Sequence, residues 1–151
     1  MYARQQGLST IEFAIVSAVM MLVTFGVIEV GRLMFTYNVL NESTRRAARV
    51  AAVCFPNGAT LTRVQTLATF ANIPNLTSAN VELTYRDAAG ATVATPAANF
   101  AQIRYVRVRI VNFTYQMYIP FMSSVLTPPD FAVTLPRESL GVPRQGAIQP
   151  C

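Results

Sequence analysis

The chain has 151 residues, of which 52% are hydrophobic and only 13% are charged. About a quarter of the residues of a typical soluble domain are charged, so this composition excludes a disordered chain and indicates association with a membrane. The chain has no histidine and only two cysteines, which excludes histidine-dependent hydrolases and imidazole metal sites. The acidic residues are few and dispersed. We therefore expect a protein that is not an enzyme, with no catalytic residue, no metal and no cofactor.

The net charge is +5, and all 12 basic residues are arginines. They are scattered along the chain and do not form one basic stretch, and the apolar content is unlike that of nucleic-acid-binding domains. We expect no nucleic-acid partner.

An uninterrupted apolar segment lies near the N-terminus. Residues 13–28 read FAIVSAVMMLVTFGVI without a charge, between Glu12 and Glu29. As a helix this run spans roughly 24 Å, and residues 8–11 extend it toward the ~30 Å of a hydrocarbon layer. The pattern predicts a transmembrane helix over about 8–31. A cleaved secretory signal is the alternative, but the run exceeds the usual apolar region and no small-residue cleavage site follows.

The charges beside this segment predict its orientation. Arg4 and the N-terminal amine precede it with no acid before Glu12, and short positive flanks stay in the cytoplasm. Everything after the segment is then outside, in an oxidising compartment that suits a disulfide between Cys54 and Cys151. Such a bond encloses roughly 100 residues and is worth ~4–5 kcal/mol in the chain-entropy model. A bond between two chains through Cys151 is the alternative.

The residues around Glu12 form a motif. Gly7-Leu8-Ser9-Thr10-Ile11-Glu12-Phe13 resembles the class III signal of type IV pilins, which a prepilin peptidase cleaves after the glycine on the cytoplasmic face. The resemblance implies that residues 1–7 are a cleaved cytoplasmic leader and that the mature chain begins at Leu8. The buried Glu12 carboxylate would then neutralise the N-terminal ammonium of a neighbouring subunit.

A longer stretch resembles one family, the TadE-like proteins of pilus assembly. The matching segments are RQQGLSTIEFAIV, GVIEVGRLMF and NESTRRAARVAA, with landmarks at Gly7, Glu12, Phe13, Gly26, Glu29, Gly31, Arg32, Ala47, Ala48 and Arg49. The resemblance implies a minor pilin or pseudopilin of a tight-adherence (Flp-type) pilus and secretion system. Its partners would be a prepilin peptidase, other minor and major pilins, and the inner-membrane assembly platform.

This resemblance also implies a location. The chain would cross the inner membrane once, with its N-terminus in the cytoplasm and residues 56–151 in the periplasm, or would be part of an extracellular pilus. The alternative function is an uncleaved single-pass membrane scaffold that recruits pilus or secretion partners through its periplasmic domain.

Two pairs on the predicted helix are candidate contact residues. Glu29 and Arg32 are i, i+3 neighbours at the outer membrane edge, where they form either an inter-subunit contact or an ion pair that snorkels to the interface. Ala14 and Ala18 form a small-xxx-small pattern that allows a second helix to approach closely in lipid.

The sequence predicts an α+β fold of the pilin kind, in which a small antiparallel sheet of three to four strands packs on the outer half of one long helix. The helix is expected over 8–55 and ends at Phe55-Pro56-Asn57-Gly58. Residues 56–151 form the outer domain. In it we expect a helix over 60–72, strands over 81–85, 91–94, 103–115 and 131–135, and a loop or short helix over 119–127.

Overall fold

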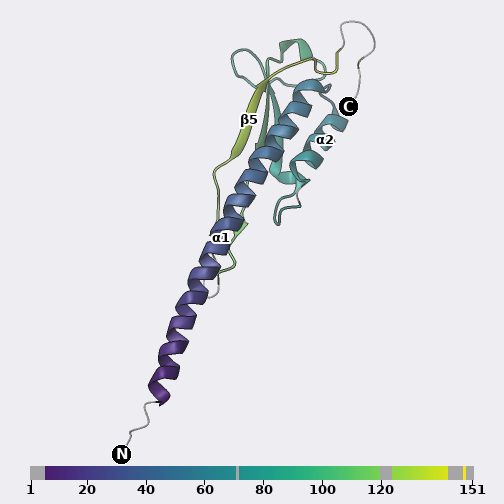
Figure 1. Cartoon of the computed structure of the whole chain (residues 1–151). Coiled ribbons are helices and arrows are strands. Elements are labelled where there is room, and N and C mark those ends of the chain that lie inside the picture. Colours follow the sequence, from purple (N-terminus) through teal and green to yellow (C-terminus); the bar gives the residue numbers. More distant parts are fainter. Residues whose placement is uncertain (1–5, 71, 120–123, 143–147, 149–151) are drawn as a thin grey trace, which may run out of the picture.

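A single long helix dominates the structure. The computed structural model describes residues 6–70, 72–119, 124–142 and 148, with the side chains of the first helix described from residue 9 onward. Helix α1 (Gln6–Val53) has 48 residues, about 72 Å at 1.5 Å per residue, and a small domain lies against its C-terminal half (Figure 1). The helix ends shortly before Pro56, because a proline disfavours helical backbone in the residue before it. The predicted long helix is confirmed.

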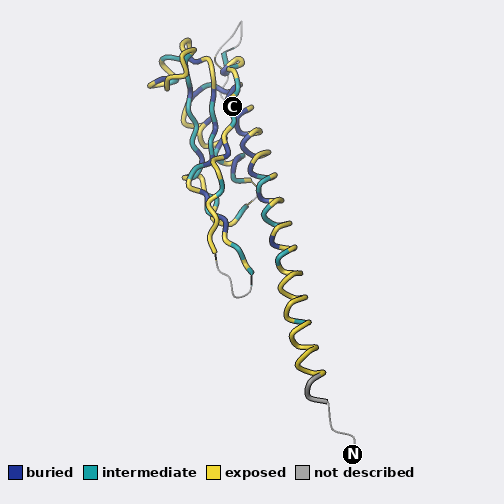
Figure 2. Tube along the Cα trace, turned by 90° about the vertical axis from the view of Figure 1, so that its left-hand side faces the viewer, coloured by how far each residue is buried: buried dark blue, intermediate teal, exposed yellow. Residues whose placement is uncertain are grey.

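The two halves of α1 have opposite surroundings. From residue 9 to residue 28 no side chain is buried, although most of them are apolar, whereas the alanines of the C-terminal half are buried completely (Figure 2). The exposed half is long and apolar enough to cross a membrane. Because water would solvate such a surface poorly, this half of the helix needs lipid or another apolar partner around it.

A three-stranded antiparallel sheet packs on the outer half of α1. It consists of β1 (Val81–Arg86), β2 (Tyr105–Ile110) and β5 (Phe131–Pro136), in the order β1-β2-β5. Side chains alternate between its two faces, so Val106 and Val108 of β2 are buried while Arg109 lies on the other face. Arg109 there pairs with Glu82 at 2.6 Å across the register of β1 and β2. On this outer face Arg109 therefore has an acidic partner from the neighbouring strand.

The core forms where the sheet meets two helices. Helix α2 (Gly58–Ala68) lies beside α1, and the Asn57 side chain caps it by accepting a 2.8 Å hydrogen bond from the Thr60 backbone N–H. Small residues on α1 let both α2 and the sheet approach closely. The core-facing alanines of α1 are Ala47, Ala48, Ala51 and Ala52.

A second apolar cluster continues the core toward the membrane-facing half of α1. Leu40 of α1 packs there with Ile110, Phe113, Tyr115 and Phe131. Phe131 also meets the ring of Tyr37 edge-on, with 5.4 Å between the ring centroids. This cluster places the start of β5 and the residues after β2 against α1.

The strand predicted over 103–115 is wrong in its extent. Strand β2 ends at Ile110, and a separate two-residue strand, β3 (Tyr115–Gln116), pairs with β4 (Val125–Leu126). Between β2 and β3, Asn112 has a φ of 54°, a left-handed conformation that interrupts an extended strand and that asparagine tolerates better than most residues. Its side-chain neighbour Asn80 holds the bend by donating to the carbonyl oxygens of residues 111 and 112.

Three smaller expectations also need correction. The segment 119–127 contains β4, which is neither loop nor helix, and α2 ends at Ala68 before the predicted end at 72. The predicted strand over 91–94 is reduced to a single bridge between Thr92 and Arg86. Short 3-10 helices, η1 (Ser78–Asn80) and η2 (Phe100–Gln102), precede β1 and β2.

Candidate functional site

The predicted cleavage motif spans the first two turns of α1, with its glycine in the first. The helix begins at Gln6, so the Gly7–Leu8 bond is helical, while residues 1–5, including Arg4, are outside the described part of the chain. The first N–H groups of a helix have no partner within it, and a glycine weakens a helix by roughly 0.5–1 kcal/mol relative to alanine. Both features weaken the helix at this turn.

The residues after this bond face away from the protein. Phe13 is 74% exposed, and Glu12, Ala14 and Ala18 are exposed as well. Within the described residues Glu12 forms no ion pair. From residue 9 onward, the side chains of the motif are thus open to lipid or to a neighbouring subunit, and the described part of the outer domain covers none of them.

Glu29 is the exception on this half of the helix, because it is only 5% exposed. Its carboxylate accepts hydrogen bonds from Arg32 Nη2 at 2.6 Å, from Arg32 Nε at 3.2 Å and from the Tyr115 phenol at 3.0 Å. The backbone N–H of Tyr118 also donates to it. A buried carboxylate is costly unless charged and polar partners surround it, and Glu29 has both kinds.

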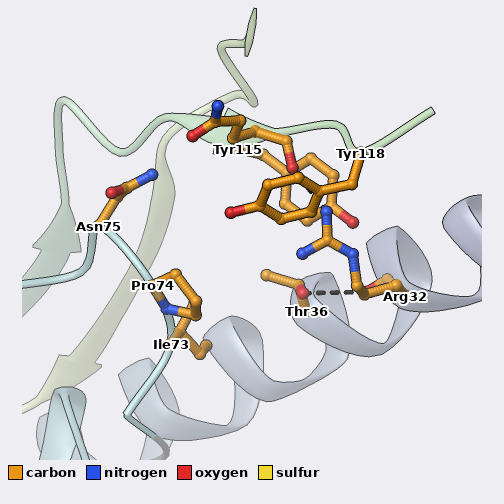
Figure 3. A pocket seen from close by; sticks show the side chains of 8 residues that line it. Arg32, Thr36, Ile73, Pro74, Asn75, Tyr115 and Tyr118 are labelled. Atoms are coloured by element: carbon orange, nitrogen blue, oxygen red, sulfur yellow. Dashed lines mark hydrogen bonds between the residues drawn. The ribbon is translucent and has the colours of Figure 1, made fainter. Parts of the chain in front are cut away.

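Arg32 is held between two aromatic rings. Its guanidinium carbon lies 4.6 Å from the ring centroid of Tyr115 and 4.6 Å from that of Tyr118, so it makes a cation–π contact with each (Figure 3). Its Nη2 also donates to the Gln116 carbonyl oxygen at 2.5 Å. Beside these groups is a cavity of about 20 Å³, room for one water molecule.

We call Glu29, Arg32, Tyr115 and Tyr118 the membrane-edge cluster. The predicted Glu29–Arg32 ion pair is present, and within this chain it joins α1 to the segment around β3. Burial in this cluster, together with the hydrogen bond to Glu29, raises the pKa of Tyr115 to about 12. The sequence interpretation missed both tyrosines. The only local signal was the alternation of aromatic and polar residues over 113–116, which includes Tyr115 but not Tyr118.

The predicted disulfide involves one described cysteine. Cys54 directly follows α1 and is 2% exposed, whereas Cys151 lies outside the described residues, so their bond stays a prediction. The chain after β5 does return to this place. The backbone N–H groups of Glu138 and Gly141 donate to the carbonyl oxygens of Ala52 and Val53, the former at 3.0 Å.

A metal site and a second charged cluster are the remaining candidates within the described residues. No group of three His, Cys, Asp or Glu side chains in the described ranges could hold a metal ion. The other charged cluster on α1 is solvent-exposed, with Arg46 paired to Glu42 at 2.7 Å and stacked over Phe70 at 5.5 Å. Because solvent screens an exposed pair of this kind, it adds little to the stability of the fold.

Comparison with known proteins identifies the segment that contains these features. The family model of TadE-like proteins matches residues 7–49. Comparisons with curated proteins and with solved structures gave no significant match. The matched segment begins in the first turn of α1, includes the cleavage motif, Glu29 and Arg32, and ends four residues before the helix does. Residues 7–49 are therefore similar to TadE-like proteins, the family that the sequence motif resembles.

Proposed function

We propose that the chain is a minor pilin or pseudopilin of a tight-adherence (Flp-type) pilus, with a structural and non-catalytic role. In this proposal a prepilin peptidase removes residues 1–7, and the apolar half of α1 anchors the subunit in the inner membrane. The N-terminus then faces the cytoplasm, and the outer domain faces the periplasm. During assembly the same half of α1 packs against other pilins on the assembly platform.

One observation carries this proposal. The whole N-terminal half of α1 is apolar and uncovered, while the outer domain covers only its C-terminal half. A surface of this kind is stable in lipid and equally stable among the apolar helices of neighbouring subunits, so the same helix can pass from membrane to filament. The TadE-like match over residues 7–49 supports the same role.

Glu12 is the charged residue that the proposal places in the contact between subunits. Its carboxylate is exposed at the edge of the apolar segment, five positions into a chain that starts at Leu8. In the low-dielectric interior of a filament, the attraction between this carboxylate and the N-terminal ammonium of a neighbour would be far stronger than in water. Pairing the two would offset the cost of burying each.

The test compares two alanine variants in the native organism. Glu12→Ala should still be processed, yet its share in sheared surface filaments relative to the membrane fraction should fall. Glu42→Ala removes an exposed acid from the outer half of the same helix and should leave that share unchanged. Normal incorporation of Glu12→Ala would contradict the proposed role of the carboxylate. Absence of the wild-type protein from the filaments would favour the uncleaved membrane scaffold.

A further inference from the structure

The β3–β4 hairpin lies at the level where the apolar half of α1 ends. Two contacts fix this level, because the Tyr115 phenol donates to Glu29 at 3.0 Å and Arg32 donates to the Gln116 carbonyl oxygen at 2.5 Å. Glu29 is the first charged residue after the apolar run of 13–28. In Figures 1 and 2 the hairpin reaches farther toward the N-terminal half of α1 than the other described parts of the outer domain.

This hairpin exposes aromatic and aliphatic side chains. Tyr118 is 61% exposed and Val125 66% exposed, and Leu126 is exposed beside it. No charged residue occurs between Tyr115 and Leu126. The described residues of this hairpin, 115–119 and 124–126, therefore present an uncharged, partly apolar surface beside the segment of α1 that can cross a membrane.

The polar groups at this level suit the head-group region of a bilayer. Tyrosine is enriched at membrane interfaces because its ring is apolar and its hydroxyl is polar. The one cation in the cluster, Arg32, is paired with Glu29 at 2.6 Å and lies between the rings of Tyr115 and Tyr118. Placing the hairpin at the head groups therefore leaves no unpaired charge at the lipid surface.

We propose that the β3–β4 hairpin is a second membrane contact, which inserts Tyr118 and Val125 into the head-group region of the leaflet that α1 leaves on its outer side. The inference rests on the membrane span of α1. We assign lipid as the partner of the hairpin because the hairpin surface continues the lipid-facing surface of the helix. Two contacts at separate points fix the tilt and rotation of a membrane helix, so the hairpin orients α1 and holds the outer domain close to the bilayer.

The experiment uses the absence of tryptophan from this chain. The full-length protein is reconstituted into phosphatidylcholine–phosphatidylglycerol vesicles as single variants Tyr118→Trp, Val125→Trp, Tyr105→Trp and Met20→Trp. Lipids carry bromine either high on the acyl chain or near its end. Tyr105 is the matched control, since it is an exposed tyrosine at the far end of β2, and Met20 reports the middle of the span.

For Tyr118→Trp and Val125→Trp we expect blue-shifted tryptophan fluorescence. Bromine high on the acyl chain, near the head groups, should quench this fluorescence more strongly than bromine near the chain end. The fluorescence of Met20→Trp should be quenched mainly by bromine near the chain end. The fluorescence of Tyr105→Trp should not be quenched by bromine at either position. Emission at both hairpin positions that resembles Tyr105→Trp would overturn the proposal. So would blue-shifted emission that no bromine affects, which would place a neighbouring protein subunit there. If Met20→Trp were not quenched, the span itself would be refuted together with the hairpin contact.

Discussion

The phenol of Tyr115 donates a 3.0 Å hydrogen bond to Oε1 of Glu29, which lies 86 residues earlier in the chain. This bond connects the outer domain to α1 at the end of its apolar half. It shows that the outer domain packs on α1 from Glu29 onward. This contact lies closer to the N-terminus of the helix than the contacts of the three-stranded sheet. The membrane-edge cluster is thus a structural joint between the membrane helix and the outer domain.

The first prediction concerns this joint. Tyr115→Phe keeps the ring against Arg32 but removes the hydrogen bond to the buried carboxylate. The free energy of unfolding of the full chain in detergent should fall by about 1.5–3 kcal/mol, the range for hydrogen bonds to charged groups. Tyr118→Phe is the matched control, because the Tyr118 side chain is exposed and its ring remains over Arg32. Equal losses in the two variants, measured by denaturant unfolding, would show that the Tyr115–Glu29 bond contributes nothing of its own.

The second prediction concerns alkaline pH. Burial raises the pKa of Tyr85 to about 12, and its hydroxyl has no hydrogen-bond partner within the described ranges. The same phenol in the unfolded chain has a pKa of about 10. Between these values only the unfolded chain releases the proton, so folding stability is complete below pH ~10. Above it, the contribution of Tyr85 alone decreases by about 1.4 kcal/mol per pH unit, and Tyr115, whose pKa is also raised to about 12, adds a decrease of its own.

Tyr85→Phe removes this contribution and should therefore reduce the loss of stability between pH ~10 and ~12, leaving the part that Tyr115 contributes. At neutral pH it should cost little, since the hydroxyl has no partner to lose. The control is Tyr105→Phe, which alters an exposed tyrosine of β2 and should keep the wild-type pH dependence. A Tyr85→Phe profile parallel to that of the wild type would refute the perturbed pKa.

Local patterns were sufficient to predict most of the secondary structure. The apolar run of 13–28 and the uninterrupted helical stretch up to Pro56 predicted α1, because hydropathy and proline act within a few residues. Alternation within 81–85 and 131–135 predicted β1 and β5 for the same reason. The packing of a small antiparallel sheet on a long helix followed from these elements.

The membrane-edge cluster could be predicted only in part. The Glu29–Arg32 pair is local, at i, i+3, so the sequence indicated it. Tyr115 reaches Glu29 only because Asn112 turns the chain after β2 and β3 then pairs with β4. The left-handed backbone of Asn112 interrupts a run whose side chains otherwise alternate as in one strand. Such a long-range contact depends on tertiary packing, which periodicity does not encode.

The third prediction concerns the apolar surface of α1. Ala14→Leu fills the small-xxx-small surface that Ala14 forms with Ala18, so it should reduce incorporation into filaments more than Val19→Leu does. Both positions are exposed in the isolated chain, so neither change should disturb the fold. Filament incorporation is measured against the membrane pool. Equal effects would mean that helices do not pack closely at Ala14.

The fourth prediction is the disulfide between Cys54 and Cys151 within one chain. Cys54 is buried where residues 138–141 return to the end of α1, and Cys151 lies ten residues beyond that contact. On non-reducing electrophoresis the protein should migrate as a compact monomer that slows after reduction. A dimer that reduction removes would instead indicate a bond between chains, and labelling of both thiols without reductant would exclude either bond.

The central claim, that this chain is processed and assembled as a pilin, is tested most directly by the N-terminal sequence of the protein extracted from membranes. The Gly7 motif and the match over residues 7–49 predict cleavage of the Gly7–Leu8 bond, so the mature protein should begin with Leu-Ser-Thr-Ile-Glu. Loss of the first seven residues also removes Arg4. A start at Met1 would contradict processing and favour the uncleaved scaffold, and a start beyond Phe13 would contradict the pilin account altogether.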